Sequence, residues 1–383
     1  MKNQVILVSL DGMPAKVFEN AWKYHGSDIH VQELWTVYPS ITVPAHVSIL
    51  TGKSPQEHGI TENLVMEGPG FEKISLYHPT VEEARRVMPE DTVVHEFAAA
   101  GLKCASINWP LGDGLPGKNH SEELTTHEEA EGVQAAYEKD QRALKLLKHE
   151  METGDKDFIA AHFEEYDGAA HIYGVEGERT VLACDHMVAY AEELLRTAKS
   201  CGVEKMIFFS DHGMLDKEEN FFPNIYAMEH GFEGEIREGR MIFLTDGSGC
   251  MQFFSDLSEE TDEAVIRCME ESGKIQAVSW LKDGEERVCT QPQRSAACGR
   301  LRRPRAILEM KRGFCSEDIM ERSEEKYHDM RGLHGYDPEH VRQMNGFFLA
   351  YDPGQRLGLK DGARLGITDI TPMIRTLVME GRT

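Results

Sequence analysis

Several Asp and His residues have types and spacings that suit divalent cations. Asp211 and His212 are adjacent, and Asp167 and His171 are four residues apart, which places the second pair on one face of a helix. An isolated Asp more often caps a helix, and a helix-start carboxylate beside a surface His explains the second pair equally well. Together, the candidates supply three carboxylates and three imidazoles, enough oxygen and nitrogen ligands for two cations. They are Asp11, Asp167, Asp211, His171, His212 and His334.

Two neighbouring cations are suited to phosphoryl transfer, because one activates the attacking oxygen while both neutralise charge on the non-bridging oxygens. The reaction also needs a nucleophile, and Thr42 is the candidate. It lies in the segment YPSITVPAH (38–46), a loop bounded by two prolines. A free Thr hydroxyl is a weak nucleophile, so it must lose its proton to a metal or a base. Without such a partner, Thr42 would only cap a helix ahead of Pro44.

The elements that position these residues are apolar runs, rich in β-branched and aromatic residues, that end in polar clusters. This pattern is typical of buried parallel strands whose carboxyl ends carry function. Helical patterns at 135–152 and 180–200 alternate with the runs, which predicts an α/β fold with a doubly wound, mostly parallel sheet and helices on both faces. The five clearest runs are Val5 to Leu10, Lys103 to Ile107, Phe158 to Phe163, Lys205 to Ser210 and Gly346 to Tyr351.

The character of the chain changes between Asp216 and Met330, where short strand and helix patterns predict a smaller α/β unit. We therefore predict a catalytic core at 1–215 and 331–383 and an inserted cap at 216–330. Within the cap, 294–312 is rich in Arg and Lys although the chain is acidic. This stretch is either a solvated basic face that pairs with the acidic core or a collar that attracts anionic substrate.

The bulk composition excludes some functions. The 383-residue chain has a formal net charge of -25, so it would repel a nucleic acid backbone, whereas small anionic substrates remain compatible with it. No apolar stretch approaches the ~20 residues that span a bilayer, and the first residues show no signal-peptide cleavage site. The eight cysteines lack CxxC pairing, as expected of reduced thiols. We expect a cytoplasmic protein with no membrane attachment and no nucleic acid partner.

Six segments, in this order along the chain, resemble the alkaline phosphatase superfamily, and most closely its type I phosphodiesterase and nucleotide pyrophosphatase branch. They are LVSLDGM, YPSITVPAHVSILTGKSPQEHGITEN, FEEYDGAAHIYG, FFSDHGM, GLHGYDP and ITDITPMIRTL. Each segment is a weak signal, but six in family order are specific, and they run through nearly the whole chain. The resemblance implies an alkaline phosphatase-like core.

The resemblance also divides the metal ligands into two groups. The first comprises Asp11, Thr42, Asp211 and His212, and the second comprises Asp167, His171 and His334. In relatives both ions are usually zinc, whereas mutase relatives use manganese with similar ligands, so either metal is compatible with the sequence. The implied mechanism is in-line attack by Thr42 on phosphorus, followed by hydrolysis of a phosphothreonine. The backbone N–H of Thr42 or Val43 would stabilise oxyanion charge.

The resemblance further implies substrate-binding residues. The family's His-Gly-Ile stretch is followed by an Asn that holds a non-bridging phosphoryl oxygen, and Asn63 occupies that position in HGITEN (58–63). On its own, Asn63 would equally be a turn residue. Asn108 and Trp109, at the end of another predicted strand, are further candidates. The alternative for this pair is that Asn108 turns the chain and Trp109 packs.

These observations predict a metal-dependent phosphohydrolase, most closely a phosphodiesterase or nucleotide pyrophosphatase, that acts on a small phosphate-containing anion. The chain departs from nucleotide pyrophosphatases at Ala45, where they typically carry Asn. It lacks the Cys/Ser-Xaa-Pro-Xaa-Arg setting of sulfatases, and no Arg near Thr42 matches the clamp of monoester-cleaving phosphatases, which favours diesters. The alternatives are a phosphonate or phosphomonoester hydrolase, or a metal-binding homologue that has lost turnover.

Overall fold

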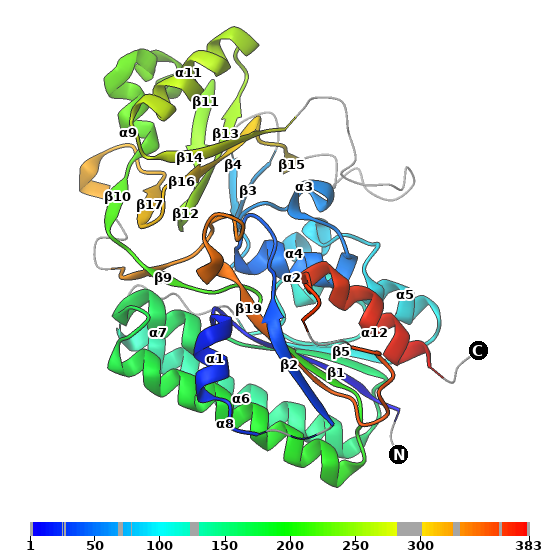
Figure 1. The fold of residues 1–383 in the computed structure, drawn as a ribbon. Coiled ribbons are helices and arrows are strands. Elements are labelled where there is room, and N and C mark those ends of the chain that lie inside the picture. Colours follow the sequence, from blue (N-terminus) through cyan, green and yellow to red (C-terminus); the bar gives the residue numbers. More distant parts are fainter. Residues whose placement is uncertain are drawn as a thin grey trace.

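The computed structural model describes residues 3–24, 26, 28–67, 72–77, 79–122, 130–281, 301–324, 330–359 and 362–380. A seven-stranded sheet with the order β2-β19-β8-β1-β7-β5-β6 forms its centre (Figure 1). The strands are β1 (Val5–Leu10), β2 (Ile29–Leu34), β5 (Cys104–Ile107), β6 (Lys118–His120), β7 (Phe158–Phe163), β8 (Met206–Phe209) and β19 (Gly346–Tyr351). All five predicted strands are present, which confirms the predicted α/β class.

The direction of β19 corrects the sequence-based prediction. β8, β1, β7, β5 and β6 are mutually parallel, but β19 runs antiparallel to both β8 and β2. A strand buried on both faces reads as a continuous apolar run in either direction, so its hydrophobicity carries no information about direction. The backbone N–H of Gly213 donates to Met344 and that of Ser210 to Phe347, so β19 begins at the carboxyl end of β8 and must run back.

Helices cover both faces of the sheet (Figure 1). One face carries α1 (Ala15–Ala21), α6 (Ala130–Thr153), α7 (Glu165–Tyr173) and α8 (Glu178–Cys201). The other face carries α2 (Thr42–Thr51), α3 (Pro55–His58), α4 (Val81–Val87), α5 (Val93–Ala99) and α12 (Ile370–Met379). Side chains of β1 alternate between the faces: Ile6 and Val8 join the cluster under α6 and α8, whereas Val5 and Leu7 join the cluster under α2 and α12.

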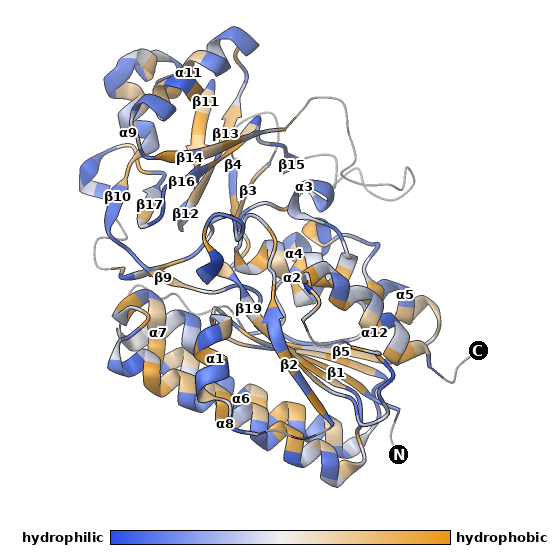
Figure 2. Ribbon diagram, in the orientation of Figure 1, coloured by the Kyte–Doolittle hydropathy of each residue, from blue (hydrophilic) through white to orange (hydrophobic). Residues whose placement is uncertain are grey.

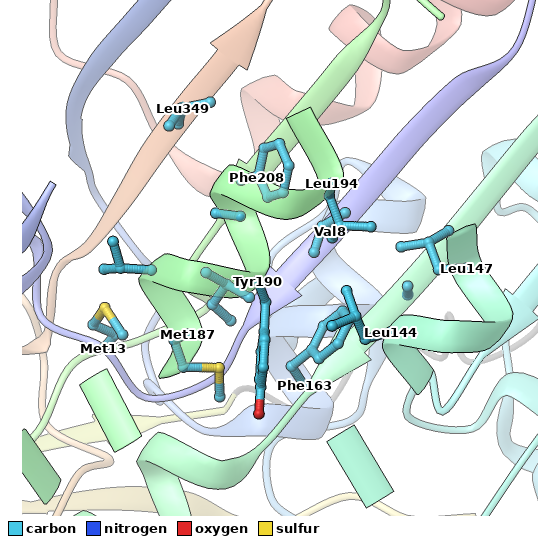
Figure 3. Close-up of a cluster of buried hydrophobic side chains, with 14 of the residues drawn as sticks. Val8, Met13, Leu144, Leu147, Phe163, Met187, Tyr190, Leu194, Phe208 and Leu349 are labelled. Carbon is cyan, nitrogen blue, oxygen red and sulfur yellow. The ribbon is translucent and has the colours of Figure 1, made fainter. Parts of the chain in front are cut away.

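The cluster on the α6 and α8 face shows how the sheet is held (Figure 3). Val8, Phe163 and Phe208 from three adjacent strands pack against Leu144 of α6 and Tyr190 of α8, and all are buried. Figure 2 shows the central strands as mainly hydrophobic and α6 and α8 as mixed, as expected for helices with one face on the core. This packing holds the carboxyl ends of the strands in register.

A second set of strands lies beyond the carboxyl edge of the central sheet (Figure 1). Its four-stranded antiparallel sheet has the order β11-β13-β16-β14 and is covered by α11 (Glu259–Glu271). The strands of this sheet are β11 (Met241–Leu244), β13 (Cys250–Ser255), β14 (Ile275–Trp280) and β16 (Ala306–Met310). Smaller elements nearby are β10 (Glu219–Phe221), β12 (Asp246–Ser248), β17 (Phe314–Glu317), α9 (Pro223–Ala227) and α10 (Glu233–Arg237).

Two strand pairs connect this unit to the rest of the chain. β9 (Leu215–Asp216) pairs antiparallel with β18 (Gly332–Leu333), so the two passages of the chain lie side by side. The hairpin of β3 (Leu64–Glu67) and β4 (Glu72–Ser75) pairs with β15 (Leu301–Arg302). Met66 of this hairpin packs against Leu244 of β11, so part of 1–215 packs within the smaller unit. The division at 216–330 stays a prediction.

The structure describes residues 301–312 of the basic stretch 294–312, and residues 294–300 lie outside the described ranges. In the remainder, the Arg302 guanidinium donates to Asp256 at 2.6 Å, and Arg305 lies 3.7 Å from Asp262. These arginines therefore pair with acidic groups. Within the described ranges, no helix combines the length and the apolar character that crossing a membrane requires.

Candidate active site

The predicted ligands meet at the carboxyl edge of the central sheet. Asp11 directly follows β1, Asp211 and His212 follow β8, and Asp167 lies in the first turn of α7, just after β7. Because β8, β1 and β7 are adjacent and parallel, their carboxyl ends deliver these side chains to one place. His334 joins them from the loop that follows β18.

Two groups of ligand atoms form, each within 4.8 Å: Asp11 with Asp211 and His212, and Asp167 with His171 and His334. In the first group, His212 Nε2 lies 3.4 Å from an oxygen of each carboxylate. In the second group, His171 Nε2 lies 3.3 Å from Asp167 Oδ2. The imidazole rings of His212 and His334 stack with centroids 4.0 Å apart, so the two groups adjoin.

All three imidazoles are oriented in the same way. The Nδ1–H of His171 donates to the carbonyl of Gly332 at 2.8 Å, and that of His334 donates to the carbonyl of Ser40 at 3.0 Å. His212 makes the corresponding bond to the carbonyl of Gly213 at 3.1 Å. A carbonyl can only accept, so Nδ1 carries a proton in each ring, and in the neutral ring Nε2 presents its lone pair to the cluster. This is the tautomer that a metal-binding histidine requires.

The carboxylates also fit a cation. Asp11 Oδ1 and Asp211 Oδ2 are buried and accept no hydrogen bond from any described residue, an arrangement that is costly without a positive charge. Burial, together with the neighbouring charges of Asp211 and Asp167, raises the pKa of Asp11 well above its usual range. Asp167 shifts the other way. Burial raises its pKa, but the positive charge of protonated His171 outweighs this effect and holds the pKa of Asp167 below its usual range.

Thr42 lies beside the first group. It is the first residue of α2, after Ile41 at the N-cap position, and its side chain is buried. Its Oγ1 is 3.1 Å from His212 Nε2. His46, one turn later, donates from Nδ1 to the Thr42 carbonyl at 2.7 Å and bonds Ser9 Oγ through Nε2 at 2.9 Å. Burial lowers the pKa of His46 to about 3, so this neutral ring braces the Thr42 backbone.

Asn63 contacts the first turn of α2. Its Oδ1 accepts a hydrogen bond from the Val43 N–H at 3.0 Å, and its Nδ2 donates to the Tyr77 hydroxyl at 2.6 Å. The Val43 N–H is therefore already used, which excludes it from the predicted oxyanion role. The Thr42 N–H, at the start of the helix, has no partner within the helix. It remains the backbone candidate for that role.

Sequence reasoning missed His162 and Tyr77. His162 Nε2 donates to Asp11 Oδ2 at 2.8 Å, and burial lowers the pKa of His162 to about 3, so it acts as a neutral donor. A signal was present, since His162 is the one polar residue in the apolar strand FIAAHF. Tyr77 carried no such signal, because its contact with Asn63 joins residues on either side of a hairpin.

Asn108 and Trp109 have structural contacts. Asn108 adopts a left-handed backbone with φ 52°, and its side-chain oxygen accepts from the Glu122 N–H at 3.1 Å. The buried Trp109 ring packs edge-on against His46 with centroids 4.8 Å apart. These contacts match the alternative in which Asn108 turns the chain and Trp109 packs. Substrate contact by this pair stays a prediction.

The family model for type I phosphodiesterase / nucleotide pyrophosphatase matches residues 5–337. Venom phosphodiesterase CdcPDE of Crotalus durissus collilineatus is 24% identical over 376 residues, covering 92% of this chain and 42% of the relative. Ectonucleotide pyrophosphatase/phosphodiesterase family member 5 of Homo sapiens is 23% identical over 229 residues, covering 57% of this chain and 46% of the relative. The chain thus spans less than half the length of these curated relatives.

Two solved structures are similar across almost the whole chain. Inactive murine ectonucleotide pyrophosphatase / phosphodiesterase 5, in complex with AMP, has a TM-score of 0.69 at 16% identity and covers 98% of this chain and 94% of that chain. Phosphonoacetate hydrolase from Sinorhizobium meliloti 1021, in complex with phosphonoformate, has a TM-score of 0.64 at 16% identity and covers 98% and 96%, respectively. At such identities the likeness establishes the fold, and it confirms the predicted alkaline phosphatase-like architecture.

Proposed function

Because the chain belongs to the type I phosphodiesterase / nucleotide pyrophosphatase family, we propose that it is a metal-dependent phosphohydrolase in which Thr42 is the nucleophile. One observation carries this proposal. Three imidazoles present their Nε2 atoms and three buried carboxylates present their oxygens in two adjoining groups, the first of which lies beside the Thr42 hydroxyl. No packing role requires that arrangement, whereas divalent cations do.

Two groups of residues would hold the cations, zinc or manganese. They are Asp11, Asp211 and His212 with the Thr42 oxygen, and Asp167, His171 and His334. When bound, the cations would supply Lewis-acid chemistry that favours the deprotonated hydroxyl and neutralises charge on the phosphoryl oxygens. The supporting residues complete the centre. His162 orients the Asp11 carboxylate, and His46 holds the backbone of Thr42.

In the proposed reaction Thr42 Oγ1 loses its proton to solvent and forms a bond to phosphorus, while the bond from phosphorus to the leaving oxygen breaks. The leaving group departs as an alcohol or a phosphate. Water then cleaves the phosphothreonine, which releases a phosphomonoester and restores the hydroxyl. Asn63 Nδ2 has one N–H on Tyr77 and a second that can bind a non-bridging oxygen. The start of α2 adds its N-terminal dipole at the same place.

The proposed substrate is a small phosphodiester or nucleotide pyrophosphate. Family membership supports this choice, and a diester presents one negative charge less than a monoester dianion to a chain of net charge -25. AMP is the ligand of the murine structural relative, which suggests a nucleotide as the first compound to try. Phosphonate hydrolysis is the second candidate, because phosphonoacetate hydrolase shares the fold over 98% of this chain.

A rate comparison tests the proposal. Purified protein loaded with Zn²⁺ or Mn²⁺ is assayed with bis-p-nitrophenyl phosphate, the p-nitrophenyl ester of a nucleoside 5′-monophosphate, p-nitrophenyl phosphate and phosphonoacetate. Acid quenching with a phosphorus-labelled diester then checks for labelled protein. We expect diester turnover and a label, both absent in Thr42→Ala. Turnover that persists in Thr42→Ala would contradict the covalent mechanism, and preference for phosphonoacetate would establish the second candidate.

A further inference from the structure

A third group of potential ligand atoms lies outside the proposed centre, at the junction of β16 and the loop that follows β18. It comprises Glu309, Asp337 and His340. Both oxygens of the Glu309 carboxylate are already occupied, since Oε1 accepts from the Asp337 N–H at 2.9 Å and Oε2 accepts from His340 Nδ1 at 2.6 Å. The group is therefore a hydrogen-bonded clamp on the loop and not a vacant cation site.

The clamped loop is the one that carries His334. We define it as the His334 loop, residues 334–340. Glu309 is almost fully buried although it lies on a strand of the predicted cap, so its charge is placed at a considerable desolvation cost. Its two hydrogen bonds to the loop recover part of that cost. The two bonds reach Asp337 and His340, three and six residues after His334. His334 is the ligand that this loop, which follows β18, contributes to the centre.

Other contacts tie the same loop to the predicted cap. The Gly249 N–H donates to the carbonyl of His334 at 2.7 Å, and the Tyr336 hydroxyl donates to the carbonyl of Phe314 at 2.8 Å. The Gly313 N–H donates back to the Tyr336 hydroxyl at 3.1 Å. The ring of Tyr336 is fully buried, so this contact is also apolar.

The opposite side of the loop contacts the nucleophile segment. The carbonyl of Ser40 accepts from His334 Nδ1 at 3.0 Å, and Ser40 Oγ donates to the carbonyl of Tyr336 at 2.8 Å. The Gly335 N–H donates to Ser40 Oγ at 3.1 Å. His334 is thus held from two sides. Ser40, two positions before Thr42, contacts one side of its loop, and the predicted cap contacts the other. Its position depends on where the cap lies.

We propose that Glu309 is a positioning residue that sets His334 from the predicted cap, so that cap docking and cation binding by the Asp167, His171 and His334 group stabilise each other. The inference rests on the proposed function, because it assumes that this group binds a divalent cation. Reciprocity follows from linkage: if docking raises the affinity for the cation, then the cation raises the stability of docking by the same factor. Loss of a hydrogen bond made directly to a metal ligand typically weakens metal binding about 10- to 100-fold. Glu309 acts on His334 through the loop, so we expect its loss to fall at the lower end, about 10-fold.

The test measures Zn²⁺ binding to the full chain by competition with a chromophoric chelator. Four variants are compared with the wild type: Glu309→Ala, Glu309→Gln, Asp262→Ala and His334→Ala. Gln retains an acceptor for the Asp337 N–H and can donate to the other tautomer of His340, so it should rescue. Asp262 is a matched control, because it is also a buried carboxylate of the cap but pairs with Arg305.

We expect two Zn²⁺-binding steps in the wild type, one of which is lost in His334→Ala. Glu309→Ala should weaken that same step about 10-fold and leave the other step unchanged. Glu309→Gln and Asp262→Ala should bind like the wild type. Wild-type affinity in Glu309→Ala, or equal weakening of every step, would overturn the proposal.

Amide hydrogen exchange separates this inference from the proposed function. In the wild type, Zn²⁺ should slow exchange in the His334 loop and in β16, and Glu309→Ala should lose this protection. Glu309→Ala should also exchange faster than Asp262→Ala in this loop without any cation. If the wild type binds neither Zn²⁺ nor Mn²⁺, the proposed function fails. Unchanged loop exchange in cation-free Glu309→Ala would overturn the positioning role itself.

Discussion

The side-chain oxygen of Asn63 accepts the backbone N–H of Val43 at 3.0 Å, and this one bond determines how the amide is turned. The Val43 N–H can only donate, so the atom that faces it is Oδ1, and Nδ2 must point the other way. Nδ2 meets the Tyr77 hydroxyl at 2.6 Å. Asn63 is therefore presented as a donor next to the first turn of α2.

Removing this donor should cost catalysis more than stability. We expect Asn63→Ala to lower kcat/KM for the preferred diester about 100- to 1000-fold, the usual cost of losing one donor to a transition-state oxyanion. Asn63→Asp should lose more, because its charge repels the phosphoryl oxygens. Asn119→Ala is the control, since that amide bonds the Leu115 carbonyl within another segment. Wild-type kcat/KM in Asn63→Ala would exclude the assignment.

Tyr77→Phe should have a smaller effect that depends on Asn63. The phenol oxygen orients the amide, and a single such hydrogen bond contributes roughly 0.5–1.5 kcal/mol, so kcat/KM should fall about 2- to 10-fold. In the Asn63→Ala background the same change should have no further effect. Steady-state kinetics of the four proteins in this cycle measure the coupling. Additive losses would show that Tyr77 acts independently of Asn63.

Gly12 is required by both its backbone and its surroundings. Its φ is +71°, and a Cβ at this position would lie 2.6 Å from Asp167 Oδ1. Gly273 has the same φ of +71° but no atom within 4 Å of its added Cβ. Both Ala variants should lose about 1–2 kcal/mol of unfolding free energy from the left-handed backbone. Only Gly12→Ala should also weaken Zn²⁺ binding, because it displaces Asp167.

Denaturant unfolding and Zn²⁺ competition on the two glycine variants check this prediction. Equal Zn²⁺ affinity in Gly12→Ala and Gly273→Ala would show that Asp167 tolerates the shift.

Glu62→Gln should stabilise the protein increasingly as the pH rises. Burial, and secondarily the charge of Asp246, raises the pKa of Glu62 well above its ordinary value of 4.5. Below that value the carboxyl is protonated in both the folded and unfolded states. Above it, Glu62 loses its proton in the unfolded chain but keeps it in the folded protein. The folding stability of the wild type therefore falls as the pH rises from the unfolded-state pKa to the folded-state pKa. Gln avoids this loss and still accepts the Asn63 N–H, as Glu62 does at 2.9 Å.

Glu57→Gln is the control of opposite sign. Hydrogen bonds from the backbone and side chain of Ser54 lower the pKa of Glu57. The contribution of Glu57 to folding stability is present above its unfolded-state pKa and is lost as the pH falls. Glu57→Gln should therefore destabilise the protein at neutral pH and have no effect on its stability in acid. Thermal unfolding between pH 4 and pH 8 measures both variants. A Glu62→Gln difference that is constant with pH would contradict the expected titration.

Much of the fold and the ligand set could be predicted from local sequence. The runs that precede Asp11 and Asp211 are apolar on both faces, which is typical of central parallel strands, and this pattern alone predicts that the two carboxylates lie at strand ends. The four-residue spacing of Asp167 and His171 likewise predicted their shared helix face, and α7 contains both. These features depend on periodicity over a few residues, so one segment suffices to reveal them.

Other parts of the site could not be predicted in this way. The direction of β19 depends on where the chain re-enters the sheet and not on its own apolar residues. The clamp of Glu309 on the His334 loop joins two segments that show no pattern relating them. The use of the Val43 N–H by Asn63 was also hidden, because a residue type does not reveal which of its atoms faces a neighbour.

The sequence by itself determined the fold class, the strand ends and the residue types that gather there, because these follow from hydrophobic periodicity and short spacings. Only the tertiary structure decided which lone pairs face inward, which backbone donors remain open, and how the predicted cap reaches His334. Those properties depend on contacts between residues far apart in the chain, such as His334 with Ser40 and His162 with Asp11. Such contacts exist only after the packed core has brought their segments together.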